Sequence, residues 1–296
     1  MKLQKNVIEY RLLLQIAYIV QSLSPAATVR LGRLLGCFAY YFVPIRKSVV
    51  FDNLTKAFPE KSKAEKRRIA RQSYMNIGQN LFEFMRTPIR SKTELNKRVI
   101  MYNSNLLHEA YQSGRGTLLS TGHFGNWEIM ACAIRALGYP IVAIAKHQRN
   151  HLVDTMITKY RLSVGLEAVA LGMNVREFLR SLKQNKFVAI LPDQDAHREG
   201  IFVNFFNQPS ATAPGPAALA LKTRAHVIFG VCILVPKGNY HVYLEKIDYD
   251  DLSDSNEENI RIFTQRHVKV LEDKIRRWPD HWFWMHKRWK TKPSDV

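Results

Sequence analysis

The fold is decided by the stretch TLLSTGHFGNWE, residues 117–128. Its first four residues are typical of a short buried strand. Gly122 and Gly125 then allow the backbone to turn sharply, and Asn126 is a favourable N-cap for a helix that we predict over residues 127–137. A strand that passes through a short turn into a helix is the building unit of an open α/β sheet, and ligands bind such sheets at the carboxyl ends of the strands.

The same alternation continues through the rest of the chain. Further strands are predicted at 141–145, 187–191, 226–234 and 240–247, and further helices at 151–162, 175–183, 216–223 and 258–277. Strands that alternate with helices in this way predict an α/β fold with a largely parallel central sheet flanked by helices.

The N-terminal segment has a different character. Apolar runs at 12–20 and 31–43 are both shorter than the roughly 20 residues that cross a bilayer. They carry aromatic side chains and are flanked by cations, which suits helices that lie in a membrane interface, although ordinary core helices remain the alternative. We therefore predict an N-terminal helical membrane-associating segment over residues 1–47 and the α/β domain over residues 48–296.

The charge and cysteine content of the chain indicate which kinds of binding partner and structural site to expect. The 296 residues include 44 Lys and Arg against 25 Asp and Glu, a formal net charge of +19. A surface this basic favours polyanions: nucleic acid, an anionic membrane, phosphorylated substrates or an acidic protein. The three cysteines, Cys37, Cys132 and Cys232, are far apart and form no CxxC pair, which argues against a disulfide framework or a zinc ribbon.

The turn after the first strand holds the best candidate for catalysis. If His123 lies in the turn and Glu128 in the first helical turn, the carboxylate can fold back towards the imidazole. A carboxylate on one ring nitrogen stabilises the imidazolium and leaves the other nitrogen free to take a proton. No G-x-S-x-G elbow or catalytic cysteine signature is present, so we expect a hydroxyl of the substrate to attack. On spacing alone, a structural histidine and, less readily, a metal site stay open.

Several ordered motifs resemble one known family. The segment His123-Phe124-Gly125-Asn126-Trp127-Glu128 resembles the H-x4-[DE] motif of the lysophospholipid acyltransferase superfamily, in the form found in the late acyltransferases of bacterial lipid A biosynthesis. The resemblance extends over nearly the whole chain. Its other elements are Asn53-Leu54 with Ala57-Phe58-Pro59-Glu60, Tyr160-Arg161, Pro192-Asp193-Gln194-Asp195, Phe202-Val203-Asn204-Phe205-Phe206 and Trp284-Met285-His286-Lys287-Arg288-Trp289-Lys290.

The resemblance implies a function for this chain. It assigns the general base to His123, its partner acid to Glu128 and further polar site residues to Arg161 and Asp193. The implied reaction moves a fatty acyl group from a thioester, usually acyl carrier protein, to a hydroxyl of a phosphorylated glucosamine lipid. It implies no cofactor and no metal, and it places the protein on the cytoplasmic face of the bacterial inner membrane.

Three further expectations complete this interpretation. Phe202, Phe205 and Phe206 are candidates to line an acyl slot, although core packing is the simpler role for at least one of them. Arg288 and its neighbouring lysines, interleaved with tryptophans, are candidates for an anionic membrane interface. Asn204 and Asn207 stand where many family members have Pro and Gly, beside the acceptor site of the superfamily, so the acceptor stays open.

The alternatives belong to other classes. Another glycolipid, such as a mannosylated phosphoinositide, or a lysophospholipid is the next acceptor to consider. A nucleic-acid-binding protein would suit the charge, but the chain has no recognisable RNA- or DNA-binding motif and we expect no nucleic acid partner. A soluble esterase would need the missing serine elbow, and a metal-dependent hydrolase would need a ligand cluster.

Overall fold

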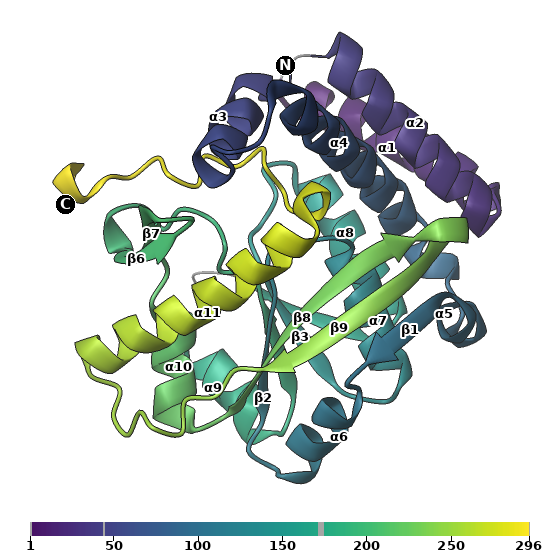
Figure 1. Ribbon diagram of the computed structural model, residues 1–296. Coiled ribbons are helices and arrows are strands. Elements are labelled where there is room, and N and C mark those ends of the chain that lie inside the picture. The colour runs from purple at the N-terminus through teal and green to yellow at the C-terminus, as the bar shows by residue number, and fades with distance from the viewer. Residues whose placement is uncertain (1, 44, 171–174, 296) are drawn as a thin grey trace.

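The computed structural model describes residues 2–43, 45–170 and 175–295. Its centre is a seven-stranded sheet in the order β1-β9-β8-β2-β5-β3-β4 (Figure 1). The strands are β1 (Val99–Tyr102), β2 (Thr117–Ser120), β3 (Ile141–Ala145), β4 (Leu166–Ala170), β5 (Phe187–Ile190), β8 (His226–Val235) and β9 (Asn239–Lys246). All neighbouring pairs are parallel except β8 and β9, which confirms the predicted α/β class.

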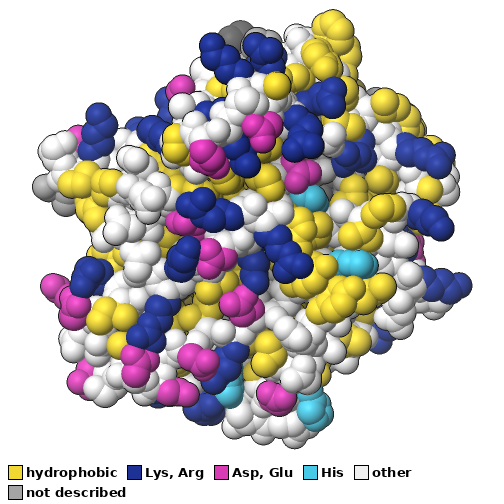
Figure 2. Space-filling view, viewed as in Figure 1, with side chains coloured by type: hydrophobic (Ala, Val, Ile, Leu, Met, Phe, Trp, Pro, Cys, Tyr) yellow, Lys and Arg dark blue, Asp and Glu magenta, His cyan; other side chains and the backbone are white. Residues whose placement is uncertain are grey.

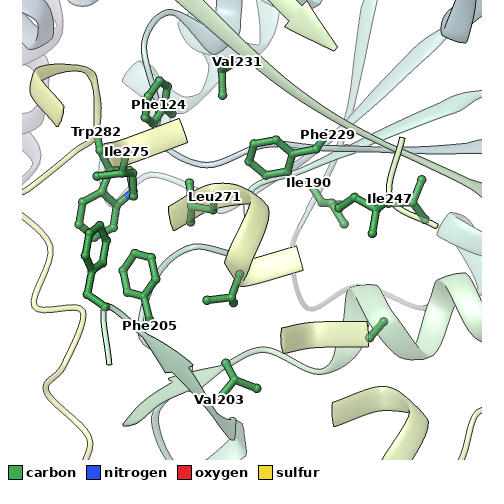
Figure 3. Close-up of a cluster of buried hydrophobic side chains, with 14 of the residues drawn as sticks. Phe124, Ile190, Val203, Phe205, Phe229, Val231, Ile247, Leu271, Ile275 and Trp282 are labelled. Carbon is green, nitrogen blue, oxygen red and sulfur yellow. The ribbon is translucent and has the colours of Figure 1, made fainter. Parts of the chain in front are cut away.

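Helices cover both faces of this sheet. One face carries α9 (Val175–Lys183), α10 (Gly215–Thr223) and α11 (Glu257–Arg277), and α11 runs across the front of the view in Figure 1. The other carries α5 (Lys92–Arg98), α6 (Asn105–Gln112) and α7 (Trp127–Ala136). Successive side chains of a strand point to opposite faces of the sheet, so each strand contributes to two core clusters. Leu118 of β2 belongs to the cluster under α11, shown in part in Figure 3, and Leu119 belongs to the cluster under α7.

Four strands were not predicted from the sequence. β1 and β4 are edge strands of four and five residues, and so short an apolar run does not distinguish a strand from part of a helix. The other two, β6 (Ile201–Phe205) and β7 (Gln208–Thr212), form a separate antiparallel hairpin. Its turn places Phe206 and Asn207 at φ of 52° and 57°. Asn tolerates this left-handed region better than most residues.

The N-terminal helices form a layer of their own beside the sheet. They are α1 (Lys2–Ser22), α2 (Pro25–Phe42), α3 (Lys47–Ala57) and α4 (Lys63–Met85), and α8 (His151–Ser163) lies next to α1 (Figure 1). α2 crosses α4 at three glycines. A Cβ atom on Gly36 would lie 2.1 Å from the carbonyl oxygen of Tyr74, and one on Gly78 would lie 2.3 Å from that of Gly32. Only glycine permits the two backbones to approach this closely.

We asked whether any of these helices is long and apolar enough to cross a bilayer. Within the described residues, no single helix combines the length and apolar character needed to cross a bilayer. The pair α2 and α3, bent by 95° at the break between them, passes the same test when taken together. The proposed division at residue 47 stays a prediction.

The C-terminal segment corrects one expectation. Trp282 and Trp284 are fully buried, and Arg288 is only 1% exposed. Arg288 donates hydrogen bonds to the carbonyl oxygen of Ala211, at 2.6 Å, and to Thr212 Oγ1, at 2.5 Å. Trp282 and Arg288 therefore hold the segment to the β6–β7 hairpin and do not face a membrane. The neighbouring lysines are exposed, and their contact with an anionic surface stays a prediction.

Candidate active site

The turn between β2 and α7 is held by β8, the strand next to β2 in the sheet, and by the C-terminal segment. Gly125 has φ +56°, and a Cβ atom there would lie 1.7 Å from the carbonyl oxygen of Cys232 in β8. The same carbonyl accepts a hydrogen bond from the backbone N–H of Asn126, at 2.9 Å. Gly125 donates to the carbonyl of His281, and Phe283 donates to that of His123, at 2.7 and 2.9 Å. The close approach of Gly125 to β8 and these three backbone hydrogen bonds together fix the position of His123.

Two asparagines complete this turn. Asn126 caps α7 as predicted, because its side-chain oxygen accepts from the backbone N–H of Ile129 at 3.0 Å. Asn80, from α4, donates to the carbonyl of Gly125 at 2.5 Å. α4 is therefore tied to the turn as well as packed beside it.

The partner of His123 is Asp193, which follows β5. Nδ1 of His123 lies 2.7 Å from Asp193 Oδ1, and the backbone N–H of His123 donates to Oδ2, also at 2.7 Å. The indole N–H of Trp282 donates to the same Oδ2 at 2.9 Å. A carboxylate can only accept, so Nδ1 carries the ring proton and Nε2 keeps its lone pair. The amide nitrogen of Gln194 lies 3.5 Å from Nε2, at the outer limit of a hydrogen bond.

The electrostatics of this pair suit a general base. Burial by itself raises the pKa of Asp193, but the charge and hydrogen bonds of His123 and the bond from Trp282 bring it down to about 2. Burial lowers the pKa of His123, but the Asp193 carboxylate outweighs that effect and raises the pKa above its ordinary value. The pair therefore stabilises the imidazolium that forms when Nε2 accepts a proton.

Glu128 does not contact His123, which differs from our expectation. Its carboxylate instead pairs with Arg161 from the last turn of α8, with Glu128 Oε1 2.5 Å from Arg161 Nη2 and Oε2 3.3 Å from Nε. Because α7 begins directly after Asn126, the first helical turn aims Glu128 towards α8, while the imidazole faces the end of β5. The charge of Glu128 raises the pKa of Arg161 against the lowering effect of burial.

A cavity of about 270 Å³ opens in front of the histidine. Helix α4 forms one wall with Ile77, Leu81 and Phe84, and Trp127, Ile157 and Phe283 supply further apolar surface. His123, Glu128 and Arg161 also line it, so the structure brings three of the predicted site residues to one cavity, and Asp193 lies directly behind the histidine. The combination of an apolar pocket with a few convergent polar groups is typical of a site for a small or chain-like ligand.

The three phenylalanines expected at an acyl slot lie elsewhere. Among the described residues, the lining of this cavity contains none of Phe202, Phe205 and Phe206. Phe205 is fully buried against Trp282 and Trp289, with ring centroids 5.5 and 5.4 Å apart, and Phe206 is 3% exposed beside Phe58. The hairpin β6–β7 is therefore anchored in the core, as Figure 3 shows for Phe205, and core packing is the role of these two rings.

Sequence reasoning missed the residues of α4 and the C-terminal segment. Ile77, Leu81 and Phe84 repeat at the spacing of an apolar helix face, and such a pattern indicates that a face is buried but not what covers it. The indole of Trp282 bonds Asp193 across 89 positions of sequence, and no local pattern reports such a contact.

We also considered the buried cysteine thiols and possible metal-binding clusters among the described residues. Burial raises the pKa of Cys132 to about 11 and that of Cys232 further still, so neither is poised as a thiolate. Within the residues that the structure describes, no group of three His, Cys, Asp or Glu side chains is arranged to hold a metal ion. The arrangement can deprotonate a hydroxyl group held at Nε2 beside an apolar slot.

Comparisons with known proteins identify relatives that are acyltransferases. The chain is 26% identical over 265 residues to the lipid A biosynthesis palmitoleoyltransferase of Escherichia coli K12, covering 89% of this chain and 85% of that protein. It is 26% identical over 286 residues to the lauroyltransferase of the same organism, covering 95% and 91%. A phosphatidylinositol mannoside acyltransferase of Mycolicibacterium smegmatis is 24% identical over 218 residues, covering 72% and 69%.

A profile of one family spans almost all of the sequence. The family described as bacterial lipid A biosynthesis acyltransferase matches residues 4–291. The chain belongs to this bacterial lipid A biosynthesis acyltransferase family, and it is an enzyme that transfers acyl groups.

Proposed function

We propose that the enzyme is a membrane-associated O-acyltransferase that moves a fatty acyl group from an acyl thioester to a hydroxyl of a lipid A precursor, with His123 as the general base. The observation that carries this proposal is the ring of His123. Its Nδ1 is held by buried Asp193, and the ring lines an apolar cavity. The family itself acts on lipid A or related glycolipids.

The reaction follows from this geometry. Nε2 of His123 takes the proton of the acceptor hydroxyl, and the oxygen attacks the thioester carbonyl carbon. The tetrahedral intermediate collapses, the C–S bond breaks, and the thiolate leaves and takes up a proton, so that an ester and a free thiol are formed. Positioned general-base catalysis contributes about 10²–10⁴-fold to such a rate. No acyl group is passed to the protein.

Glu128 and Arg161 have a separate role in this proposal. Arg161 lines the cavity and is oriented by Glu128 through two nitrogens of its guanidinium group. A guanidinium group fixed in this way presents positive charge to the oxyanion or to a substrate phosphate. Glu128 acts through Arg161 and not through the imidazole.

Acyl carrier protein is the donor that we propose, and a phosphorylated glycolipid is the acceptor. Acyl carrier protein is acidic, and the chain carries a net charge of +19, which favours association with both partners. The similarity to a phosphatidylinositol mannoside acyltransferase makes a mannosylated phosphoinositide the second candidate acceptor. Its match covers a smaller share of the chain than the lipid A enzymes do, and we therefore favour the lipid A precursor.

Attachment to the cytoplasmic face of the bacterial inner membrane is supported by the surface of α1 and α2. Large apolar side chains are exposed along both helices: Ile8, Leu12, Tyr18, Ile19, Leu31, Leu34, Leu35, Phe38, Tyr41 and Phe42. Lys and Arg side chains are interspersed among the hydrophobic ones in this region (Figure 2). Apolar bulk with flanking cations suits an interface with anionic lipids.

Reconstitution tests the proposed reaction directly. The purified protein is incubated in detergent micelles with acyl carrier protein loaded with fatty acids of 12 to 16 carbons (roughly the range of acyl groups to sample), and with each candidate acceptor. We expect a product heavier by one acyl group with the lipid A precursor, and no product from the His123→Ala variant. Near wild-type turnover by that variant would refute the assigned base, and product only from the phosphoinositide would reassign the acceptor.

A fractionation experiment tests the proposed attachment. We expect the protein to stay with anionic membranes at low salt and to be released by detergent. Recovery in the low-salt soluble fraction would contradict membrane association through α1 and α2.

A further inference from the structure

A second cavity, of about 660 Å³, lies beside the first. It is formed by the N-terminal half of α2, the end of β8, the turn at 236–238 and the segment before Trp282. Asn76 and His281 line both cavities, so the two cavities share part of a wall. This larger cavity differs from the catalytic one in its charge.

Three cations line this second cavity: Arg30, Arg33 and Lys237. The single acidic residue in its lining is Asp280, whose carboxylate lies 3.2 Å from Nδ1 of His281. Among the described residues, no carboxylate is within ion-pair distance of any of the three cations, although most other arginines near the site have such a partner. With three cations against one carboxylate, the lining carries a net positive charge.

Arg33 shows that this charge is built into the fold. Its guanidinium is held by two neutral amides of α4, with Nη1 donating to Asn76 Oδ1 and Nη2 donating to Gln72 Oε1, each at 2.7 Å. Burial lowers the pKa of Arg33, and the nearby charge of Asp280 only partly offsets this. A partly buried guanidinium that is oriented but not neutralised is an anion-binding group.

The turn that carries Lys237 is also fixed. Lys237 and Gly238 have φ of 65° and 76°, and the carbonyl of Gly238 accepts hydrogen bonds from Nε and Nη2 of Arg98, at 3.1 and 2.8 Å. Arg98 is in turn paired with buried Glu83 at 2.5 Å. A buried ion pair thus supports the turn that presents the lysine.

We propose that this basic cavity binds a phosphate group of a substrate while the reacting centre occupies the neighbouring catalytic cavity. The proposal rests on the acyl transfer proposed above and extends it to the second site. Two substrates carry a phosphate: the glycolipid acceptor, and the phosphopantetheine arm of the donor. Both have a polar phosphate joined to a longer body, which suits a site that shares a wall with the catalytic cavity.

A pair of substrate comparisons distinguishes these sources. The value of kcat/KM is measured for the phosphorylated and the dephosphorylated acceptor, and separately for acyl phosphopantetheine and for acyl pantetheine, which lacks only the phosphate. Wild type is compared with the Arg30→Gln/Lys237→Gln double variant and with each single variant, since both side chains are exposed and outside the packed core. We expect one of the two ratios to fall by roughly 10–100-fold in the double variant, which is the effect of losing charge-assisted hydrogen bonds.

The matched control is Arg180→Gln/Lys183→Gln on α9, which removes the same two charges from another exposed surface and is expected to leave both ratios unchanged. A fall in the acceptor ratio identifies the acceptor phosphate, and a fall in the donor ratio identifies the donor. If wild type transfers acyl groups but neither ratio changes in the double variant, the second site is refuted and the proposed function stands.

Binding supplies a measurement that needs no turnover. In a His123→Ala background, titration calorimetry of the phosphorylated acceptor and of acyl phosphopantetheine gives each dissociation constant. We expect the added Arg30→Gln/Lys237→Gln substitutions to weaken one of them by a similar factor. Unchanged affinity for both ligands would overturn the inference even if the enzyme transferred no acyl group.

Discussion

Replacing Asp193 with asparagine isolates the electrostatic contribution of the buried carboxylate. The change keeps the size of the side chain and removes a charge that lies 2.7 Å from the ring of His123. Against the effect of burial, His123 and Trp282 together lower the pKa of Asp193 from 3.8 to about 2 in the folded protein, a net stabilisation of the carboxylate on the order of 2–3 kcal/mol at about 1.4 kcal/mol per pKa unit. Loss of the charge beside the developing imidazolium should slow turnover by on the order of 10–10²-fold, and by up to about 10⁴-fold if asparagine also favours the other ring tautomer.

The pH dependence of the same variant gives a sharper test. A general base must be unprotonated, so activity rises with pH through the pKa of His123. In the wild type that pKa is raised above 6.5, and the acid limb of kcat/KM should lie above that value. Without the carboxylate, burial dominates and lowers the pKa of His123, so the acid limb of Asp193→Asn should move below 6.5.

Glu128→Gln is the matched control, because it also converts a carboxylate of the cavity region to an amide. Its partner is Arg161 and not the imidazole, so we expect lower turnover with the acid limb still above 6.5. The assay is steady-state acyl transfer between about pH 5 and 9, a range that brackets histidine titration. If Glu128→Gln shifts the limb and Asp193→Asn does not, Glu128 is the partner of the base and our assignment is wrong.

Three further substitutions test the fold and the cavity. Gly36→Val places side-chain atoms against the Tyr74 carbonyl, and should lower the free energy of unfolding by about 1–3 kcal/mol in a denaturant titration, whereas an unchanged midpoint would refute the close helix crossing. Phe84→Ala enlarges the apolar wall and should shift the preferred donor towards longer acyl chains in a competition assay, so an unchanged preference would exclude this wall from acyl binding. Arg288→Met removes two buried hydrogen bonds and should cost about 2–4 kcal/mol of stability, whereas weaker membrane binding without that cost would restore the surface role first expected for it.

The fold was predictable where local patterns carry the information. The apolar runs, the glycines of the first turn and the cap at Asn126 predicted the strand–turn–helix unit that places His123. The edge strand β1 is a run of only four apolar residues directly after a helix, which periodicity cannot assign to a strand, and its pairing with β9 depends on a distant part of the chain.

The sequence indicated several residues that lie together at the candidate site, but not which of these side chains contact one another. Sequence spacing linked His123 with Glu128 because they are neighbours in the chain. The sheet instead brings the end of β5 beside the end of β2, so Asp193 reaches the imidazole across 70 positions and Glu128 is left to Arg161. Phe205 and Phe206 pack in the core and do not line the cavity, which the sequence could not show because a cluster of aromatic residues indicates burial equally well in a core and in a ligand pocket.

The central claim is that the acceptor hydroxyl attacks the thioester directly, with no acyl group on the protein. The most direct measurement is the intact mass of the enzyme after incubation with acyl carrier protein loaded with a fatty acid, in the absence of any acceptor. We predict the mass of the unmodified chain and no burst of free thiol. An added mass of one acyl group, formed in step with a stoichiometric release of thiol, would contradict the account.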